Sequence, residues 1–360
     1  MSAINVKKYE AIMNKYKISW VAPFLLAAGL TTQAAEATEL MFLNWSDYMD
    51  PEILEEFEQR TGVTVKLSYF DSDTSRNELL LETEGKGYDV ALINGASIRV
   101  LAKRGWLEPL DETAIPNLKH LDPRWRTTYE GADTYGIPYS WGSIGIAYRQ
   151  DLVPFTVSSW MDLFQPPKVL HGRVSMISDS SELIGAALKA LGYSLNSTDE
   201  EELKEAEALL QTQAPAVKTY RYLSLNEDSA LLNGQIAMSM MYNGDTLMLQ
   251  EHNENIAFVF PEEGSNIWTD YLSVFSASTE KAAAKQFIDF LNEPKIAARL
   301  AQYIHYATPN RAAEEFLPTD FKNNPVIYPN EKALAKSETY HRLPARTQKR
   351  RSAIFSRIVN

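Results

Sequence analysis

Aromatic side chains recur beside carboxylates at the ends of apolar runs in this sequence. The face of an aromatic ring attracts an ammonium group within about 6 Å and also covers methylene groups, while a carboxylate neutralises the ammonium charge. Open α/β sheets bind ligands beyond the carboxyl ends of their strands, so this pattern predicts a box for an alkyl polyamine. The groups are Trp45 with Asp47 and Tyr48, Tyr242 with Asp245, and Trp268 with Asp270.

The rings of these groups have a second interpretation, which is ordinary core packing. Tryptophan is usually well buried in folded proteins, so Trp45 and Trp268, and similarly Tyr242, do not define a site by themselves. The acids are harder to explain by packing, because each closely follows an apolar run, where an unpaired acid costs several kcal/mol. The acids therefore carry more of the prediction than the rings.

A further acid pair, Asp179 and Glu182, follows the apolar segment 174–178. Aspartate is a common N-cap, and an acid three residues later completes a box-like cap. A cap is the favoured interpretation, although a carboxylate at a helix start also accepts an N–H group from a ligand. The alternative function is an exported acid/base enzyme such as a glycosidase. Inverting glycosidases keep two carboxyls about 6.5 to 9.5 Å apart, which these positions reach only by splaying.

The common catalytic and cofactor motifs are missing from the sequence. No GxSxG elbow, Walker loop or GxGxxG follows an expected strand. There is no cysteine, and the histidines have no metal-ligand spacing. We therefore expect a protein without cofactor or metal that is not an enzyme. The five histidines are His120, His171, His252, His305 and His341.

The composition is that of a folded, acidic protein. The chain has 360 residues, with 45% hydrophobic and 23% charged residues, which leaves room for two ordinary domains. The formal net charge is -12, and residues 1–35 carry four lysines and one glutamate, so the remainder carries -15. Such acidity disfavours nucleic acid as a partner and suits a cationic ligand. We expect a monomer.

The N-terminus has the layout of a secretory signal peptide. Four lysines between Lys7 and Lys17 precede the apolar run Ile18–Leu30, and Ala35-Glu36-Ala37 offers an A-x-A cleavage site. The run is shorter than the roughly 20 residues that a membrane span needs. Residues 1–35 are therefore predicted to be a cleaved signal peptide that directs export to the periplasm, with an uncleaved anchor as the alternative.

Beyond the N-terminus, short apolar runs alternate with helical patterns, which predicts βαβ units and a parallel sheet. Asp50 and Pro51 mark the start of the first helix. A second block of the same kind begins near Gly172, and residues 135–148 could carry a crossing between the two blocks. Pro294 is expected to divide the long helical pattern after Glu280.

Several segments together resemble the periplasmic spermidine/putrescine-binding proteins of bacterial ABC importers. The resemblance runs in collinear order from about Leu40 to the C-terminus. Any single segment is weak evidence, but the ordered set is specific. The segments are Asn44–Tyr48, Tyr88–Asn94, Ile137–Ile146, Leu191–Tyr193, Tyr242–Gly244, Trp268–Asp270 and Tyr306–Asn310.

The resemblance implies a two-lobe periplasmic binding protein fold of type II, with α/β lobes and the ligand cleft between them. Hinge closure of the lobes would clamp the ligand. Each lobe is expected to be discontinuous in sequence. Lobe 1 would comprise residues 38–143 and 270–314, lobe 2 residues 149–265 and 319–360, and the hinge crossings residues 144–148, 266–269 and 315–318.

The resemblance also implies roles for individual residues. Trp45 and Tyr242 match rings that stack along the aliphatic chain, and Trp268 matches another ring of the box. The acids that match amine-binding positions are Asp47, Glu182, Asp245 and Asp270, with Asp179 as a further candidate. Looser matches are Ser46 and Tyr48 in the first binding loop, Asn94 after the third strand, and Tyr306 near the cleft. The chain departs from spermidine-preferring members at Ala96, where they carry an aromatic, and near Tyr340, where some carry glutamine.

The partner implied by the resemblance is an ABC permease or, as in the norspermidine-sensor branch of the family, a membrane signalling receptor. A closed pair of lobes presents a surface that the open pair lacks, whichever partner reads it. The C-terminal tail is basic in an otherwise acidic chain and could face such a partner, although a charge run is usually a solvated helix face. Its basic residues include Arg342, Arg346, Lys349, Arg350, Arg351 and Arg357.

Overall fold

A nine-stranded mixed sheet forms the centre of the computed structural model, which describes residues 38–359. The expected signal peptide, residues 1–35, lies outside the described residues. The strand order is β2-β1-β3-β9-β4-β7-β5-β6, and β8 pairs with β4. The strands are β1 (Glu39–Trp45), β2 (Thr64–Phe70), β3 (Val90–Asn94), β4 (Ile137–Arg149), β5 (Val174–Ser175), β6 (Val217–Thr219), β7 (Met238–Tyr242), β8 (Ile256–Val259) and β9 (Ile267–Val274).

The prediction of a parallel sheet is correct for only part of this sheet. β1 is parallel to β2 and β3, and β5 is parallel to β6 and β7. In contrast, β9 is antiparallel to β3 and β4, and β4 is antiparallel to β7 and β8. The reason is that β4 leaves the first half of the sheet and β9 returns to it, so the two strands run in opposite directions. Hydrophobic alternation reports a strand's burial but not its direction.

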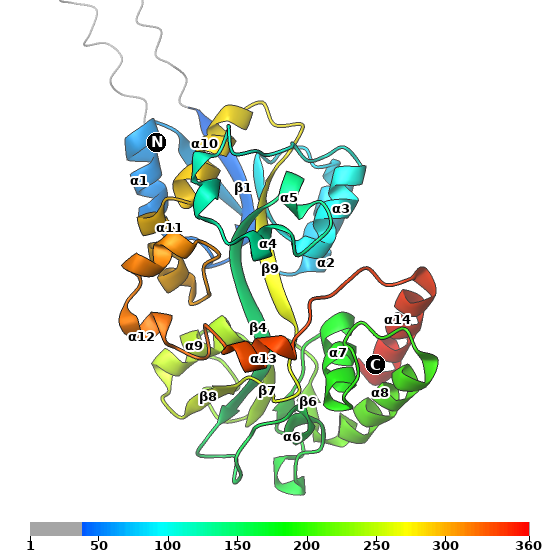
Figure 1. Cartoon of the computed structure of the whole chain (residues 1–360). Coiled ribbons are helices and arrows are strands. Elements are labelled where there is room, and N and C mark those ends of the chain that lie inside the picture. The colour runs from blue at the N-terminus through cyan, green and yellow to red at the C-terminus, as the bar shows by residue number, and fades with distance from the viewer. Residues whose placement is uncertain (1–37, 360) are drawn as a thin grey trace, which may run out of the picture. The chain divides into compact units, whose positions relative to one another are not determined.

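β4 belongs to both halves of the sheet. Residues 137–143 pair with β9, whereas residues 144–149 pair with β7 and β8. The strand is buried from Ile137 to Ala147, because helices cover it on its way through the protein. Figure 1 shows β4 and β9 running side by side from one half to the other. The exact lobe boundaries given above stay predictions.

Helices flank the sheet, and none of those within residues 38–359 has the length and apolar character of a membrane-spanning helix. The α-helices of the first part of the chain are α1 (Pro51–Thr61), α2 (Asp73–Thr83), α3 (Gly95–Lys103), α4 (Pro123–Arg126), α5 (Ala132–Tyr135), α6 (Trp160–Phe164) and α7 (Ser180–Ala190). Those of the second part are α8 (Glu200–Gln213), α9 (Asn243–His252), α10 (Lys281–Leu291), α11 (Pro294–Ile304), α12 (Thr319–Lys322), α13 (Glu331–Ala335) and α14 (Ala345–Val359). Short 3-10 helices are η1 (Pro116–His120), η2 (Lys168–Leu170), η3 (Ala214–Ala216) and η4 (Arg311–Phe316).

The predicted helix boundaries at two prolines are confirmed. Asp50 caps α1 by accepting the N–H of Glu52 at 2.9 Å, and Pro51 is the first helical residue. α1 ends at Thr61 and is capped by Gly62, whose φ of 73° lies in the left-handed region that glycine adopts without strain. Pro294 begins α11 directly after α10, because proline fits the first turn of a helix but not its interior.

Two large apolar clusters form the cores of the two halves. In the first, the ring of Phe287 from α10 lies 5.7 Å from that of Phe42 and 5.0 Å from that of Phe57. The second cluster is built around Trp160 and includes Ile354 from α14. Tyr242 packs against both clusters. The last residue of β7 therefore lies at the junction of the two cores.

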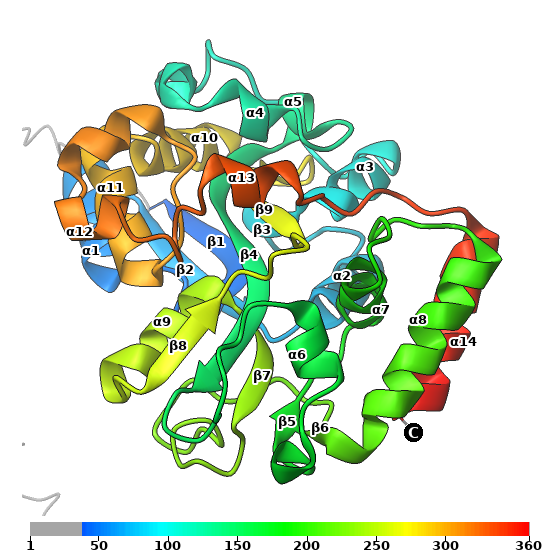
Figure 2. The ribbon, with the colours of Figure 1, turned by 60° about the horizontal axis from the view of Figure 1, so that its bottom comes forward.

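The basic C-terminal tail forms α14, which packs on α7 and α8 (Figures 1 and 2). Arg351 is buried and donates to the carbonyl oxygens of residues 195 and 197 at 2.7 and 3.1 Å. Arg350 pairs with Glu200 at 2.8 Å and with Glu207 at 2.9 Å, and Arg357 pairs with Glu207 at 2.6 Å. Half of the six basic residues are thus engaged within the chain, which favours a packing role for this part of the tail. Arg351 lies inside the protein, so it belongs neither to a solvated helix face nor to a surface that faces a partner.

We predict that α14 stabilises the second core through its apolar face more than through its charges. Ile354→Ala should lower the free energy of unfolding by about 2–5 kcal/mol, because it leaves a cavity in a packed core. Arg357→Ala should change it far less, because a surface ion pair is screened by water and salt. Urea denaturation followed by circular dichroism measures both. Equal effects of the two substitutions would contradict this account.

Candidate functional site

Rings from both halves of the sheet meet at the junction of the two cores. Tyr242 ends β7, and its ring lies 5.9 Å from that of Trp268 in β9. Trp268 lies 4.9 Å from Tyr306, which follows α11, and Tyr306 lies 5.6 Å from Tyr48. Trp45, at the end of β1, lies 6.4 Å from Tyr48. The structure thus brings the five aromatic residues predicted from the sequence into one continuous cluster.

Trp268 and Asp270 reach this cluster by a different route from the one predicted. Both were expected at the carboxyl end of a strand, but they lie near the start of β9. Because β9 is antiparallel to β3, its start lies at the same edge as the end of β3, and Asp270 is the register partner of Asn94. The expected edge of the sheet is correct, whereas the position of these two residues within their strand was wrong.

Asp245 lies in the first turn of α9, with 4% of its surface exposed. Its carboxylate accepts a hydrogen bond from the Tyr306 hydroxyl at 2.7 Å, one from the Tyr222 hydroxyl, and a long one from the Tyr48 hydroxyl at 3.5 Å. Burial raises the pKa of Asp245, and these hydrogen bonds oppose the rise. Sequence reasoning missed Tyr222, because it lies in the loop after β6 and no periodicity marks it.

The two acids at the start of α7, Asp179 and Glu182, have different hydrogen-bond partners. Asp179 is the N-cap, as predicted, and accepts the N–H groups of Ser181 and Glu182 at 2.8 and 2.9 Å. Glu182 does not close a capping box with it. Its carboxylate instead accepts from the Asn266 amide at 2.7 Å and from the Tyr340 hydroxyl at 3.1 Å. The pair therefore forms a simple cap plus a second acid that is turned to other partners.

Glu182 is buried, with 6% of its surface exposed. Burial, together with the charge of Asp179, raises the pKa of Glu182 to about 8. Tyr340 reaches this acid only because residue 185 is glycine, since a Cβ there would lie 2.2 Å from the tyrosine oxygen. The departure from the family at Tyr340 thus places a hydroxyl directly on one of the implied amine-binding acids.

Asp270 is the third strongly perturbed acid, with 9% of its surface exposed. Burial raises the pKa of Asp270 to about 7, the charge of Asp73 adds to the rise, and that of Arg76 opposes it. Asp73 and Arg76 were not predicted as site residues. They stand three residues apart at the start of α2, a spacing typical of helical ion pairs, and that spacing is the signal by which the pair could have been found.

Two of the implied site residues stand apart from the aromatic cluster. Ser46 and Asp47 are exposed in the loop after β1, and Asp47 has a φ of 61°. Partial burial and, after it, the charge of Asp47 raise the pKa of Tyr303, a residue of α11 that is 41% exposed. The structure therefore places Asp47 near the surface, and a direct contact between it and an amine stays a prediction.

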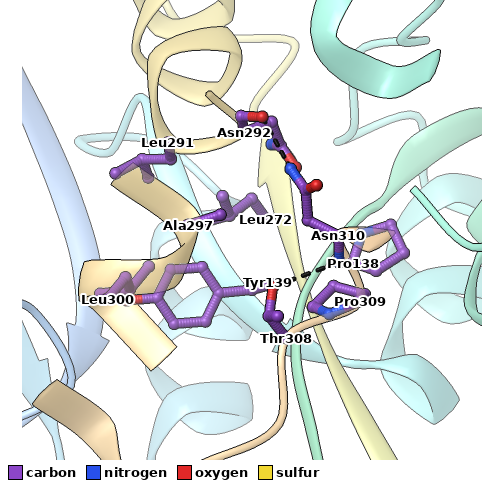
Figure 3. Close-up of a pocket in the computed structure, with 10 residues that line it drawn as sticks. All are labelled: Pro138, Tyr139, Leu272, Leu291, Asn292, Ala297, Leu300, Thr308, Pro309 and Asn310. Carbon is purple, nitrogen blue, oxygen red and sulfur yellow. Dashed lines mark hydrogen bonds between the residues drawn. The ribbon is translucent and has the colours of Figure 1, made fainter. Parts of the chain in front are cut away.

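A small cavity inside the first half does not coincide with this cluster. It has a volume of about 10 Å³ and is lined by Tyr139, Leu300 and Asn310, among others (Figure 3). Asn310 donates its amide to the carbonyl oxygen of Asn292 at 2.8 Å along its wall. A volume of this size holds about one water molecule. The cavity is therefore a packing defect rather than a ligand site.

The site thus consists of aromatic faces, buried carboxyl groups and hydroxyls, which are groups that bind organic cations. Within residues 38–359 no group of three or more His, Cys, Asp or Glu side chains is arranged to hold a metal ion. The family model of the bacterial extracellular solute-binding protein matches residues 52–329. The chain belongs to this family.

Relatives of this solute-binding protein include polyamine-binding proteins. The norspermidine sensor of Vibrio cholerae is 32% identical over 336 residues, which cover 93% of this chain and 92% of the relative. The spermidine/putrescine-binding periplasmic protein of Escherichia coli is 30% identical over 329 residues, which cover 91% of this chain and 93% of the relative. These similarities confirm the resemblance to the spermidine/putrescine-binding family and to its norspermidine-sensor branch.

Solved structures support the fold of this solute-binding protein. The putative spermidine/putrescine ABC transporter from Listeria monocytogenes superposes with a TM-score of 0.80 at 30% identity, covering 89% of this chain and 98% of that one. The spermidine/putrescine substrate-binding protein PotD from Streptococcus pneumoniae gives the same score at 28% identity, with the same coverage. The two-lobe periplasmic binding protein fold implied by the sequence is confirmed.

The raised pKa of Glu182 predicts a pH-dependent stability. A carboxyl group that is protonated more readily in the folded state stabilises the fold below its ordinary pKa of 4.5, and this contribution is lost as the pH rises through about 8. The melting temperature of the ligand-free protein should therefore fall, relative to that of Glu182→Gln, between pH 5 and pH 8.5. Differential scanning calorimetry measures both. The exposed Glu262→Gln is the control and should follow the parent protein, and parallel curves for all three proteins would refute the prediction.

Proposed function

We propose that this chain is a periplasmic polyamine-binding protein that clamps spermidine-, norspermidine- or putrescine-like amines in the cleft between its two lobes. The observation that carries the proposal is the set of buried carboxyl groups of Glu182, Asp245 and Asp270, with the half-buried Asp179, beside a continuous cluster of rings. The names of its relatives, a norspermidine sensor and spermidine/putrescine-binding proteins, support the same ligand class.

The charge balance of the site favours a cationic guest. Burial is the largest cause of the raised pKa values of all four acids, and the main influences on Asp179, Glu182 and Asp245 include no cationic side chain of the described residues. A buried carboxylate without a cation is unfavourable, and each ammonium group of a polyamine removes one such cost. Binding of an amine should therefore favour the ionised form of these acids.

The aromatic rings are suited to contact the methylene groups of such a ligand. Methylene groups between two ammonium groups gain by leaving water for an apolar contact, and the faces of Trp45, Tyr242 and Trp268 offer such contacts at the junction of the two cores. The same faces attract the neighbouring ammonium charge. A site built of planar rings and separate acids thus fits a thin chain with several charges better than a compact polar molecule.

The remaining parts of the proposal follow from the same assignment. Residues 1–35 act as a cleaved signal peptide, and the lobes are divided at the crossings 144–148, 266–269 and 315–318. Closure of the lobes on a ligand creates the surface that a partner reads. The protein acts as a monomeric binding component and catalyses no reaction of the amine.

The partner is either an ABC permease or a membrane signalling receptor, and one experiment separates the two. Purified tagged protein, with and without norspermidine, is used to recover partners from detergent-solubilised membranes of its host. Recovery of permease subunits assigns the chain to import, and recovery of a receptor with a cytoplasmic signalling domain assigns it to sensing.

We predict that Asp270→Asn weakens amine binding by about 1–3 kcal/mol, because it removes a charge-assisted hydrogen bond from a buried site. Isothermal titration calorimetry with spermidine, norspermidine and putrescine measures the change. The exposed Asp320→Asn on α12 alters the net charge equally and should leave the affinity unchanged. Absence of binding heat for every amine with the parent protein would refute the proposed function, whereas an unaltered affinity of Asp270→Asn would only remove Asp270 from the site.

A further inference from the structure

The start of α2 places one more acid at the edge of the sheet where Asp270 lies. Asp73 is the first residue of α2, directly after the capping residue Ser72. The amide Nδ2 of Asn94 donates to the Asp73 Oδ2 at 2.5 Å. Asn94 is itself the register partner of Asp270 on the neighbouring strand. Asp73, Asn94 and Asp270 therefore follow one another along the same edge of the sheet.

The carboxylate of Asp73 is fixed before any ligand arrives. The Arg76 Nη1 lies 2.5 Å from the Asp73 Oδ1, so each carboxylate oxygen has one partner. The Asn94 Oδ1 accepts the backbone N–H of Ser97 at 3.0 Å, which directs its NH2 group toward Asp73. A group held in its binding orientation loses little entropy on binding a ligand.

Asp73 stays accessible while its cationic partner does not. The Asp73 side chain is 43% exposed, whereas that of Arg76 is 0% exposed. The Arg76 guanidinium lies 5.2 Å from the centre of the Phe70 ring and donates to the Asn77 side chain at 3.2 Å. The Asp73 Oδ1 faces Arg76 and is buried without a hydrogen bond, so a ligand can reach only Oδ2. A carboxylate oxygen has about two lone-pair positions, and Asn94 uses one of those on Oδ2. Asp73 thus retains acceptor capacity, and the buried arginine holds it from behind.

The charge of Asp73 also acts on acids across the junction. It raises the pKa of Asp179 and Glu182 at the start of α7, and that of Asp270 in β9. Like charges that are close together oppose each other's ionisation. Arg76 lowers the pKa of Asp270, but this one guanidinium stands beside four acids, and the pKa values of Asp270 and Glu182 stay raised. A ligand with three ammonium groups among these acids relieves more of their mutual repulsion than a ligand with two.

We propose that Asp73 is a specificity-determining residue of this site, which recognises a third ammonium group and so favours linear triamines over diamines. The inference rests on the proposed polyamine function and goes beyond it by assigning the preference to one side chain. The competing explanation is that Asp73 serves only to neutralise Arg76.

The test compares Asp73→Asn with the parent protein by isothermal titration calorimetry against spermidine, norspermidine and putrescine. Asp73→Asn should weaken the binding of both triamines about tenfold or more, and that of putrescine less than about twofold. The control Glu82→Gln removes the same charge from the exposed end of α2 and should leave the affinities for all three amines unchanged. If Asp73→Asn melts well below the parent protein because Arg76 is left unpaired, the double variant Asp73→Asn/Arg76→Met, which removes that charge, takes its place.

The outcomes separate the possible explanations. A collapse of the triamine-to-diamine affinity ratio in a variant with an unchanged melting temperature supports the inference. An unchanged ratio, with or without a uniform loss of affinity for all three amines, overturns it and leaves the polyamine function standing. If the parent protein binds none of the three amines, the proposed function fails, and this inference fails with it.

Discussion

The burial of several carboxyl groups without matching cations is the constraint on which this protein depends. Glu182, Asp245 and Asp270 are buried and Asp179 is half-buried, and each has a raised pKa because loss of contact with water penalises its charge. Arg76 opposes the rise only partly at Asp270. In the ligand-free protein the surrounding structure offers hydroxyls, amides and one helix start as partial compensation. Phenol groups satisfy Asp245, an amide and a phenol satisfy Glu182, and backbone N–H groups satisfy Asp179. These neutral donors stabilise the acids without cancelling their charge.

Strand direction explains how these acids meet. β1 and β3 end at the edge of the sheet where β9 begins, so a residue at a strand's start can lie beside residues at two strands' ends. The second half contributes through β7 and through the helix starts of α7 and α9. The site is therefore assembled from pieces of chain that are distant in sequence. Strands and helix starts position Trp45, Tyr242, Trp268 and the four acids, whereas Tyr48, Tyr222 and Tyr306 reach it from loops.

Much of this arrangement could be predicted from the sequence, because it depends on local signals. Asp50, Pro51 and Pro294 mark helix boundaries by rules of capping and backbone geometry, and Asp179 is an N-cap for the same reason. The pattern of rings beside acids indicated Trp45, Tyr48, Tyr242 and Trp268, and the family resemblance added Tyr306. Pairings between distant residues could not be predicted: nothing near Glu182 in sequence indicates Asn266 or Tyr340, and nothing near Asp245 indicates Tyr222. The predicted strand direction was wrong at Trp268 and Asp270, because apolar residues alternate in the same way whichever direction a strand runs.

The continuity of β4 through both halves restricts the mechanics of this protein. Ser143 is the last residue of β4 that pairs with β9, and Ile144 is the first that pairs with β7. The pairing of β4 therefore continues without a gap where its partner changes. A rotation of one half against the other can therefore be absorbed as extra torsion spread along the ribbon formed by β4 and β9. Such a rotation therefore does not require any ladder of backbone hydrogen bonds between the strands to break.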